Sequence, residues 1–528
     1  MAVLCGQSPE AAYTIAGTVI NVRTGQPISR ALVELIAFPD PAAVRQDHLE
    51  APAPAATFSD AGGAFKFPGL APGRYQISAR KPEFTPLQEE AAPRFFTLDK
   101  SREDLQLRLS PLGVIEGKVV DQDGEPVRGV NIIAVTRPIV DGRRLSRFSR
   151  SVSTDDRGLY RLWNLAPESY YIKASGRSNA TSLYIGNLGP DTSSSQGFAP
   201  VYFGGGPALD SAQPIALEAG GDVHADLRIN MQPAFNIRGS LTGYATDKTV
   251  SFELFSGDED VAAGRTSLDG STGRFVIHDV IPGAYTLRAT QLRQSRGEVP
   301  VSVAGADLSG VALALARGVD VPVTIPGSAA PTPAPAAIPN DNDIDHEPQP
   351  GCMATLTSTD LRSLQTYRAN APANPVFHDV LPGAYRLSLQ CFGGYVSSVT
   401  SGTTDLLANP VLTIEGGAAP APIEVSMKRG GANLTVTATL DSPPPKLWVL
   451  LVPLSGASAG TELRQVLPTA PRQAQFENLA PGQYSVYLVS TNEIEFRNPA
   501  FLQTLSAGAG VSIQEGGDQQ VTLTSLAR

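Results

Sequence analysis

The chain contains few of the residues on which most metal and redox sites depend: five histidines, three cysteines and two tryptophans in 528 residues. It has no apolar run of about 18 residues, the length that a transmembrane helix needs. Charged residues make up 17%, the net charge is −10, and no long basic cluster occurs, so the electrostatic footprint of a nucleic-acid-binding protein is absent. Helical periodicity is also missing over useful lengths, which favours strands.

Glycine and proline are what the chain has in excess, with 50 and 44 residues. Together with 42% hydrophobic residues, this composition is typical of a folded protein with many tight turns, and it stays below the level that indicates disorder. At roughly 100–150 residues per domain, the length predicts three to five domains.

One short motif recurs five times. It reads apolar, any residue, Pro, usually Gly, any residue, Tyr, and its tyrosines lie 95, 115, 100 and 99 residues apart. The turn and core residues of the five copies are Pro72, Gly73 and Tyr75; Pro167 and Tyr170; Pro282, Gly283 and Tyr285; Pro382, Gly383 and Tyr385; and Pro481, Gly482 and Tyr484. This spacing suits separately folded domains rather than the units of roughly 20–50 residues that build a solenoid.

The motif predicts a turn followed by a half-buried strand. Proline fixes φ near −65°, as in a type II turn, and the glycine is then expected to take the positive-φ position. In the second copy Glu168 replaces this glycine, so a type I or widened turn is expected there. Apolar residues alternate after each turn. The tyrosine is expected to bury its ring and bond its hydroxyl to backbone, like the tyrosine corner of immunoglobulin-like sandwiches.

Further strands complete each copy. The first two copies begin with strands at Gly17–Val19 and Gly117–Val119, and every copy ends with another alternating strand. We therefore predict an all-β chain of about five tandem immunoglobulin-like β-sandwich domains. The predicted boundaries are 13–111, 112–232 with a long loop insertion at 175–214, 233–317, 318–429 with a Pro/Ala/Asp-rich loop at 327–350, and 430–528; residues 1–12 are interpreted as the remnant of a signal peptide.

The first two copies resemble the carboxypeptidase regulatory-like domain, a transthyretin-like and Cna-B-like sandwich of the carbohydrate-binding-like kind. The shared pattern is Gly-x-Val, then Gly-x-Pro-[Ile/Val] before a strand, then Leu-Ala-Pro, usually Gly, and Tyr; the other three copies share only the last part. The resemblance implies an exported bacterial protein, periplasmic or at the cell surface. It also implies a non-catalytic module of the type that accompanies peptidases, outer-membrane receptors and adhesins.

Patterns that would indicate chemistry are incomplete. None of the five histidines has a glutamate three residues on, as a zinc peptidase needs. Ser458 lies in Gly-x-Ser-x-Gly, but no helix is predicted after it. Asp341, Asp343 and Asp345 alternate without the Gly and Glu of a calcium loop. Lys118 suits a Cna-B-like crosslink, yet no other copy has its counterpart. No catalytic, metal-binding or cofactor-binding residue is predicted, and no cofactor.

Two groups of residues remain as candidate sites. Cys352 and Cys391 lie in strand-like segments of one predicted domain, where they form either a disulfide or two buried thiols. Tyr184, Tyr202 and Phe203 lie in the long loop of the second copy, where they either stack on a sugar or partner protein or pack on their own domain.

We predict a non-enzymatic protein of the bacterial envelope that acts as a structural or interaction scaffold. Its expected partner is an envelope protein or polysaccharide, with no nucleic acid and no membrane span. One alternative is a carbohydrate-binding protein that uses loops of the sandwich domains. A more remote alternative is an accessory part of a peptidase or outer-membrane receptor system.

Overall fold

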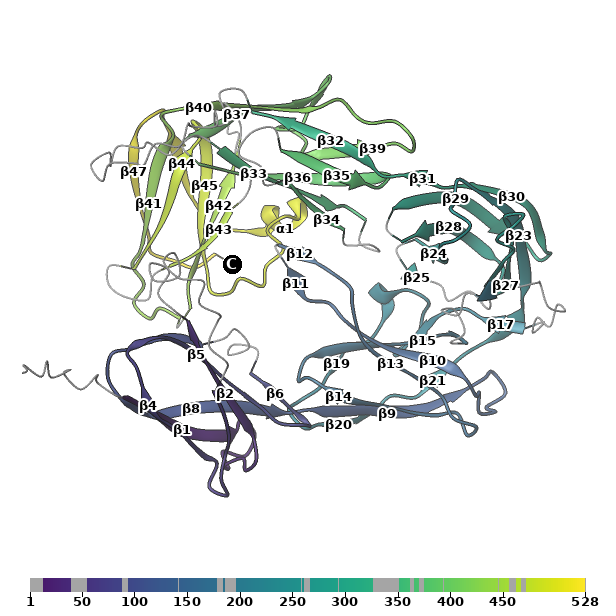
Figure 1. Cartoon of the computed structure of the whole chain (residues 1–528), viewed down its shortest axis with the longest axis horizontal. Coiled ribbons are helices and arrows are strands. Elements are labelled where there is room, and N and C mark those ends of the chain that lie inside the picture. Colours follow the sequence, from purple (N-terminus) through teal and green to yellow (C-terminus); the bar gives the residue numbers. More distant parts are fainter. Residues whose placement is uncertain are drawn as a thin grey trace, which may run out of the picture. The chain divides into compact units, whose positions relative to one another are not determined.

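The computed structural model describes most of the chain, and strands dominate it (Figure 1). The described residues are 13–38, 55–87, 94–140, 142–177, 184–185, 196–257, 259–260, 266–292, 294–325, 351–360, 365–369, 375–392, 394–444, 446–454, 462–466 and 472–527. They group into two compact units. The first unit comprises Met1–Thr136, Phe148–Ser175 and Pro200–Asn230, and the second comprises Arg137–Arg147, Gly176–Ala199 and Met231–Arg528.

The first unit contains two β-sandwiches. One sheet of the first sandwich has the order β4 (Ala64–Leu70), β1 (Tyr13–Asn21), β8 (Arg102–Pro111), β6 (Phe84–Pro86), and the other has β3 (Ala55–Phe58), β2 (Leu32–Phe38), β5 (Gly73–Arg80), β7 (Arg94–Leu98). In the second sandwich, β14 (Leu159–Leu165), β9 (Gly113–Val120) and β20 (Asp222–His224) form one sheet, with β21 (Leu227–Arg228) also on β9. The facing sheet has β13 (Arg147–Ser153), β10 (Val130–Thr136), β15 (Ser169–Arg177), β18 (Val201–Tyr202), with β19 (Ile215–Ala216) on β15.

The second unit begins with a third sandwich. Its sheets are β16 (Tyr184–Ile185), β26 (Thr266–Leu268), β27 (Arg274–Val280), β23 (Phe235–Thr242), β30 (Leu308–Ala314), and β25 (Glu259–Asp260), β24 (Val250–Ser256), β28 (Gly283–Gln291), β29 (Ser295–Val303), β31 (Ala316–Arg317). Two small two-stranded sheets also belong to this unit: β11 (Ile139–Val140) with β12 (Arg143–Arg144), and β17 (Gln196–Phe198) with β22 (Met231–Pro233).

The fourth and fifth sandwiches complete this unit. The fourth has β35 (Val376–Val380), β32 (Val319–Thr324), β40 (Ile423–Lys428), β37 (Tyr395–Ser401), β38 (Thr404–Asp405) facing β34 (Thr366–Ala369), β33 (Gly351–Ser358), β36 (Gly383–Phe392), β39 (Val411–Ile414). The fifth has β44 (Gln473–Leu479), β41 (Ala432–Ala438), β47 (Asp518–Leu523) facing β43 (Glu462–Gln465), β42 (Trp448–Pro453), β45 (Gly482–Val489), β46 (Ala509–Ile513). The prediction of about five tandem sandwiches is confirmed, whereas the exact boundaries remain a prediction.

The same topology recurs in all five sandwiches. The first strand pairs in parallel with the last, as β1 does with β8 and β41 with β47. The strand before each proline motif pairs antiparallel with the first strand, while the strand after the motif lies in the opposite sheet. Each motif therefore carries the chain from one sheet to the other across the core.

Each sandwich buries the tyrosine of its motif. The hydroxyls of Tyr75, Tyr170, Tyr285, Tyr385 and Tyr484 each donate to the carbonyl of the residue just before the proline, at 2.8–2.9 Å. All five side chains are buried, with exposures of 7% or less. The alternating residues that follow are buried too, except Leu389, which is only partly buried. The predicted tyrosine corner is thus present in every copy.

The predicted turn geometry is wrong in one respect. Gly73 and Gly283 do not adopt a positive φ, whereas Gly383 and Gly482 do, with φ of 149° and 154°. The position that has a positive φ in all five copies lies three residues before the proline and holds Gly69, Asn164, Asp279, Asp379 and Asn478, with φ of 73°, 57°, 59°, 52° and 55°. Gly, Asn and Asp are the residues that tolerate this conformation best. Opposite each of them the strand register shifts, so the strand before the motif carries a β-bulge.

Helix is scarce in the described residues, and the helix α1 (Pro499–Thr504) was not expected from the sequence. Its start follows familiar rules, because Asn498 Oδ1 accepts from the Ala500 amide at 3.1 Å and Pro499 takes the first helical position. η2 (Leu209–Ser211) is a single 3₁₀ turn. None of the helices in the described part of the chain is long and apolar enough to cross a bilayer.

Candidate functional site: a groove on the second sandwich

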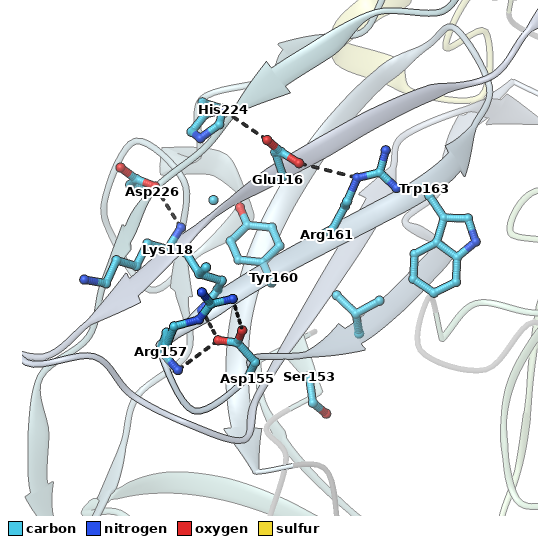
Figure 2. Close-up of a pocket in the computed structure, with 13 residues that line it drawn as sticks. Glu116, Lys118, Ser153, Asp155, Arg157, Tyr160, Arg161, Trp163, His224 and Asp226 are labelled. Carbon is cyan, nitrogen blue, oxygen red and sulfur yellow. Dashed lines mark hydrogen bonds and ion pairs between the residues drawn. The ribbon is translucent and has the colours of Figure 1, made fainter.

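The second sandwich carries an open groove of about 740 Å³ (Figure 2). Its floor is the sheet of β14, β9 and β20, from which Arg161, Glu116 and His224 project. Its rim includes Ser153 at the end of β13 and the turn that leads from β13 into β14. β13 and β14 each end the strand order of their sheet, so the groove lies at the open side of the sandwich.

Trp163 is the exposed aromatic residue of this groove. It occupies the bulge that precedes the motif, since Leu162 pairs with Ile115 and Leu165 with Gly113, which leaves two residues of β14 opposite one of β9. A bulge re-aims the side chain that it carries, and 44% of Trp163 is exposed. The guanidinium of Arg150, on β13, lies 4.9 Å from the ring centroid of Trp163. This distance fits a cation–π contact.

A row of charged side chains crosses the floor of the groove. Glu116 on β9 stands opposite Arg161 on β14 and His224 on β20 in the strand register. Its carboxylate lies 3.4 Å from Arg161 Nε and 3.7 Å from His224 Nδ1. Arg161 and His224 are largely open to solvent and Glu116 is partly exposed, so the contacts add little stability. The row therefore offers donors and acceptors to a ligand at the surface.

The turn between β13 and β14 fixes one end of the groove. Asp155 Oδ1 accepts from the backbone amides of Leu159 and Arg157 at 2.8 and 2.9 Å, and Arg157 Nη2 lies 3.4 Å from Oδ2. The bond from the Leu159 amide, with those from Arg157, holds the pKa of the Asp155 carboxyl below its ordinary value. Asp155 therefore stays ionised and organises the turn.

Tyr160 lies beneath the floor of the groove and connects β14 to the segment between β20 and β21. Its ring is buried and its hydroxyl donates to the carbonyl of Ala225. Burial, with a smaller contribution from the charge of Asp226, raises the pKa of Tyr160 far above its ordinary value. Gly117 makes room for this contact, because a Cβ there would lie 2.3 Å from the Ala225 carbonyl oxygen. Tyr160 thus supports the groove and does not act as an acid or base at neutral pH.

The residues predicted from the sequence lie elsewhere. Cys352 on β33 and Cys391 on β36 stand opposite each other and form a disulfide, the first of the two alternatives. Tyr202 is 1% exposed and lies beneath Lys173, whose Nζ is 5.6 Å from the ring centroid. Its ring face is therefore covered, which contradicts the idea that it stacks on a ligand, and Phe203 is partly buried.

Other predicted features fall partly outside the described residues. The Tyr184 backbone pairs with Ser267 of β26, while its side chain is not described. Ser458 and the residues Asp341, Asp343 and Asp345 lie outside the described residues altogether. Within the described part of the chain, no three His, Cys, Asp or Glu side chains lie together as a metal site would require.

Sequence reasoning missed Trp163 and its charged neighbours. The available signal was the alternation along β14, in which Tyr160 and Leu162 point inward and Trp163 therefore points outward. The bulge beside it depends on pairing with β9, some fifty residues earlier in the chain, and no local pattern reports such pairing.

Comparisons with known proteins support the fold. Residues 14–94 match the family model of the carboxypeptidase regulatory-like domain, which confirms the resemblance for the first sandwich. A search of curated proteins found no match.

Solved structures that match include the minor pilin GBS52 of Streptococcus agalactiae, with 14% identity, a TM-score of 0.24, and coverage of 42% of this chain and 97% of the pilin. The shaft pilin SpaA of Lactobacillus rhamnosus GG matches with 10% identity, a TM-score of 0.21, and coverage of 42% and 98%. A streptococcal ancillary pilin matches with 14% identity, a TM-score of 0.19, and coverage of 58% and 99%. At these scores the likenesses carry no argument about function.

Proposed function

We propose that this chain is a non-catalytic scaffold of the bacterial envelope, exported to the periplasm or the cell surface, whose domains hold partners in place. The observation that carries the proposal is how little chain separates one sandwich from the next. Only Leu112 lies between β8 and β9, and only Gly318 lies between β31 and β32. Three residues, 429–431, connect β40 to β41. Links this short restrict reorientation of the domains that they join.

Contacts at these links support the same idea. Within the first unit, Arg23 Nη1 donates to the Gly220 carbonyl at 2.9 Å, which ties the first sandwich to the second. The Leu112 amide donates to the Glu83 carbonyl at 2.9 Å, so the link itself is held. A protein that only tethers its domains would not need such contacts. The resemblance of the first sandwich to a module that accompanies envelope proteins supports the proposed location.

The fourth sandwich adds a feature of exported proteins. Its Cys352–Cys391 disulfide is of the kind that persists in oxidising compartments outside the cytosol. An envelope protein or a polysaccharide is the expected partner.

Two measurements test the proposal. Small-angle scattering should give a narrow distance distribution for the intact chain and a broader one for a variant with a Gly-Ser segment inserted beside Leu112; equal distributions would argue against a scaffold. A panel of peptide, ester and glycoside substrates should show no turnover by the intact chain. Turnover that persists through purification would contradict the non-catalytic part.

A further inference from the structure

We propose that the groove on the second sandwich binds an acidic polysaccharide, with Trp163 stacked on a sugar ring and Arg150 and Arg161 bound to a carboxylate of the sugar. The inference rests on the proposed function, because it names the class of partner that the scaffold holds.

Trp163 supplies the stacking surface. An indole ring is flat and apolar on its faces, and it packs well on the C–H face of a pyranose ring. Arg150 lies over the Trp163 ring, yet 44% of the residue stays exposed, so contact area remains for a ligand. Trp163 belongs to the outward-facing set of β14, with Leu159 and Arg161, and therefore lies at the rim of the groove rather than in the core.

The charges around Trp163 suit a ligand that carries many hydroxyl groups. Arginine and lysine only donate hydrogen bonds, whereas ionised carboxylates only accept them. A sugar hydroxyl does both, so it can bond to Glu116 and to Arg161 at the same time. The groove presents both kinds of group: its lining includes Lys118, Arg157, Arg161, Glu116, Asp155 and Asp226.

The balance of charge points to an acidic sugar. The whole chain has a net charge of −10, whereas three cationic and three anionic side chains line the groove and Arg150 adds a further cation beside Trp163. Arg161 precedes Trp163 by two residues on β14, and Figure 2 shows the two side chains next to each other. A guanidinium binds a carboxylate through two parallel hydrogen bonds, so a uronate residue would be held beside the stacked ring.

An extended acidic peptide is the competing ligand, because β14 is a sheet edge to which a strand could add. The bulge at Trp163 and Asn164 argues against it. A bulge interrupts the regular row of backbone donors and acceptors that an added strand needs, and it is one of the ways in which proteins protect sheet edges. Polyglutamate therefore serves as a test of the peptide alternative.

Tryptophan fluorescence gives a direct readout, since the chain has only Trp163 and Trp448. The intact protein is titrated with alginate oligosaccharides, and binding is followed by fluorescence and by calorimetry. We expect a saturable fluorescence change that persists in Trp448→Phe and disappears in Trp163→Phe. Raising the salt from about 50 to about 500 mM should weaken binding, because partly exposed ion pairs are screened.

Matched variants localise the site. By calorimetry, Trp163→Ala and Arg161→Gln should each weaken binding roughly tenfold or more. Two exposed residues of the same sandwich outside the groove, Phe148 and Arg128, provide the controls Phe148→Ala and Arg128→Gln, which should bind like the wild type. Circular dichroism should show that all variants are folded.

Several results would overturn the inference. These are the absence of saturable binding to alginate, equally tight binding of neutral dextran or of polyglutamate, and unchanged affinity in Trp163→Ala. Each of them leaves the scattering test of the scaffold untouched. Cleavage of the alginate during the titration would instead contradict the non-catalytic function itself, so the two failures are distinguishable.

Discussion

Replacing Arg288 by methionine should destabilise the third and fourth sandwiches together. Arg288 lies on β28 and is 2% exposed. Its Nε donates to Glu298 Oε1 at 2.7 Å, its Nη2 donates to Asp360 of the fourth sandwich, and its guanidinium lies 4.7 Å from the Phe255 ring centroid. Burial acts to lower the pKa of Arg288, but the carboxylates of Glu298 and Asp360 outweigh it and raise that pKa.

The size of the effect follows from what the substitution leaves behind. Removing one partner of a buried ion pair costs about 3–5 kcal/mol, because the remaining charge is left uncompensated. The side chains of Glu298 and Asp360 are 34% and 17% exposed, so water relieves part of this penalty. Methionine keeps much of the packing volume. We therefore expect a loss of about 2–3 kcal/mol, somewhat below the cost of a fully buried pair.

Native-state hydrogen exchange resolves this loss in the intact chain. Amides of β28 and of β33 should exchange roughly 30- to 150-fold faster in Arg288→Met. The control is Arg80→Met, which removes an ion pair with Glu34 whose side chains are 64% and 26% exposed and should change stability by about 0–1 kcal/mol at most. If β33 exchanges no faster in Arg288→Met than in Arg80→Met, the junction between the two sandwiches does not depend on this arginine.

Three further predictions concern single sandwiches. Tyr170→Phe should lower the stability of the second sandwich by about 1–2 kcal/mol in thermal unfolding, because the Ala166 carbonyl loses the hydroxyl that donates to it at 2.9 Å. The control is Tyr13→Phe, which changes a half-buried side chain and should have little effect on stability. Burial raises the pKa of Tyr75 and Tyr285, so the folded state keeps protons that the unfolded chain loses. The contribution of these tyrosines to the stability of the first and third sandwiches should be full below about pH 10 and should fall as the pH rises further. Urea unfolding at a series of alkaline pH values measures this stability, and the absence of such a fall would contradict the prediction. Reducing the Cys352–Cys391 disulfide, which spans 39 residues, should destabilise the fourth sandwich by about 4 kcal/mol on the chain-entropy account; melting with and without reductant measures it, and an unchanged melting temperature would refute it.

Most of the fold could be predicted from the sequence because the motif and the alternation around it are local patterns. Tyr170 and Ile172 could be assigned to the core from their period alone, and both are fully buried. The turn was harder, because the residue that needs a positive φ, such as Asn164, is set by a bulge against another strand. Tyr202 looked like a loop aromatic available to a ligand, but packing with Lys173 covers it. The groove depends on strand order, which a local pattern does not determine.

Stretching single molecules tests the central claim most directly. Five separately folded sandwiches predict five unfolding steps, each releasing about 300–400 Å of chain at ~3.4 Å per residue. The step of the fourth sandwich should be shorter by about 130 Å while the Cys352–Cys391 disulfide is intact. Adding a reductant should bring this step to its full length. Two large steps that follow the two compact units, with no five-step pattern under any loading rate, would contradict the account.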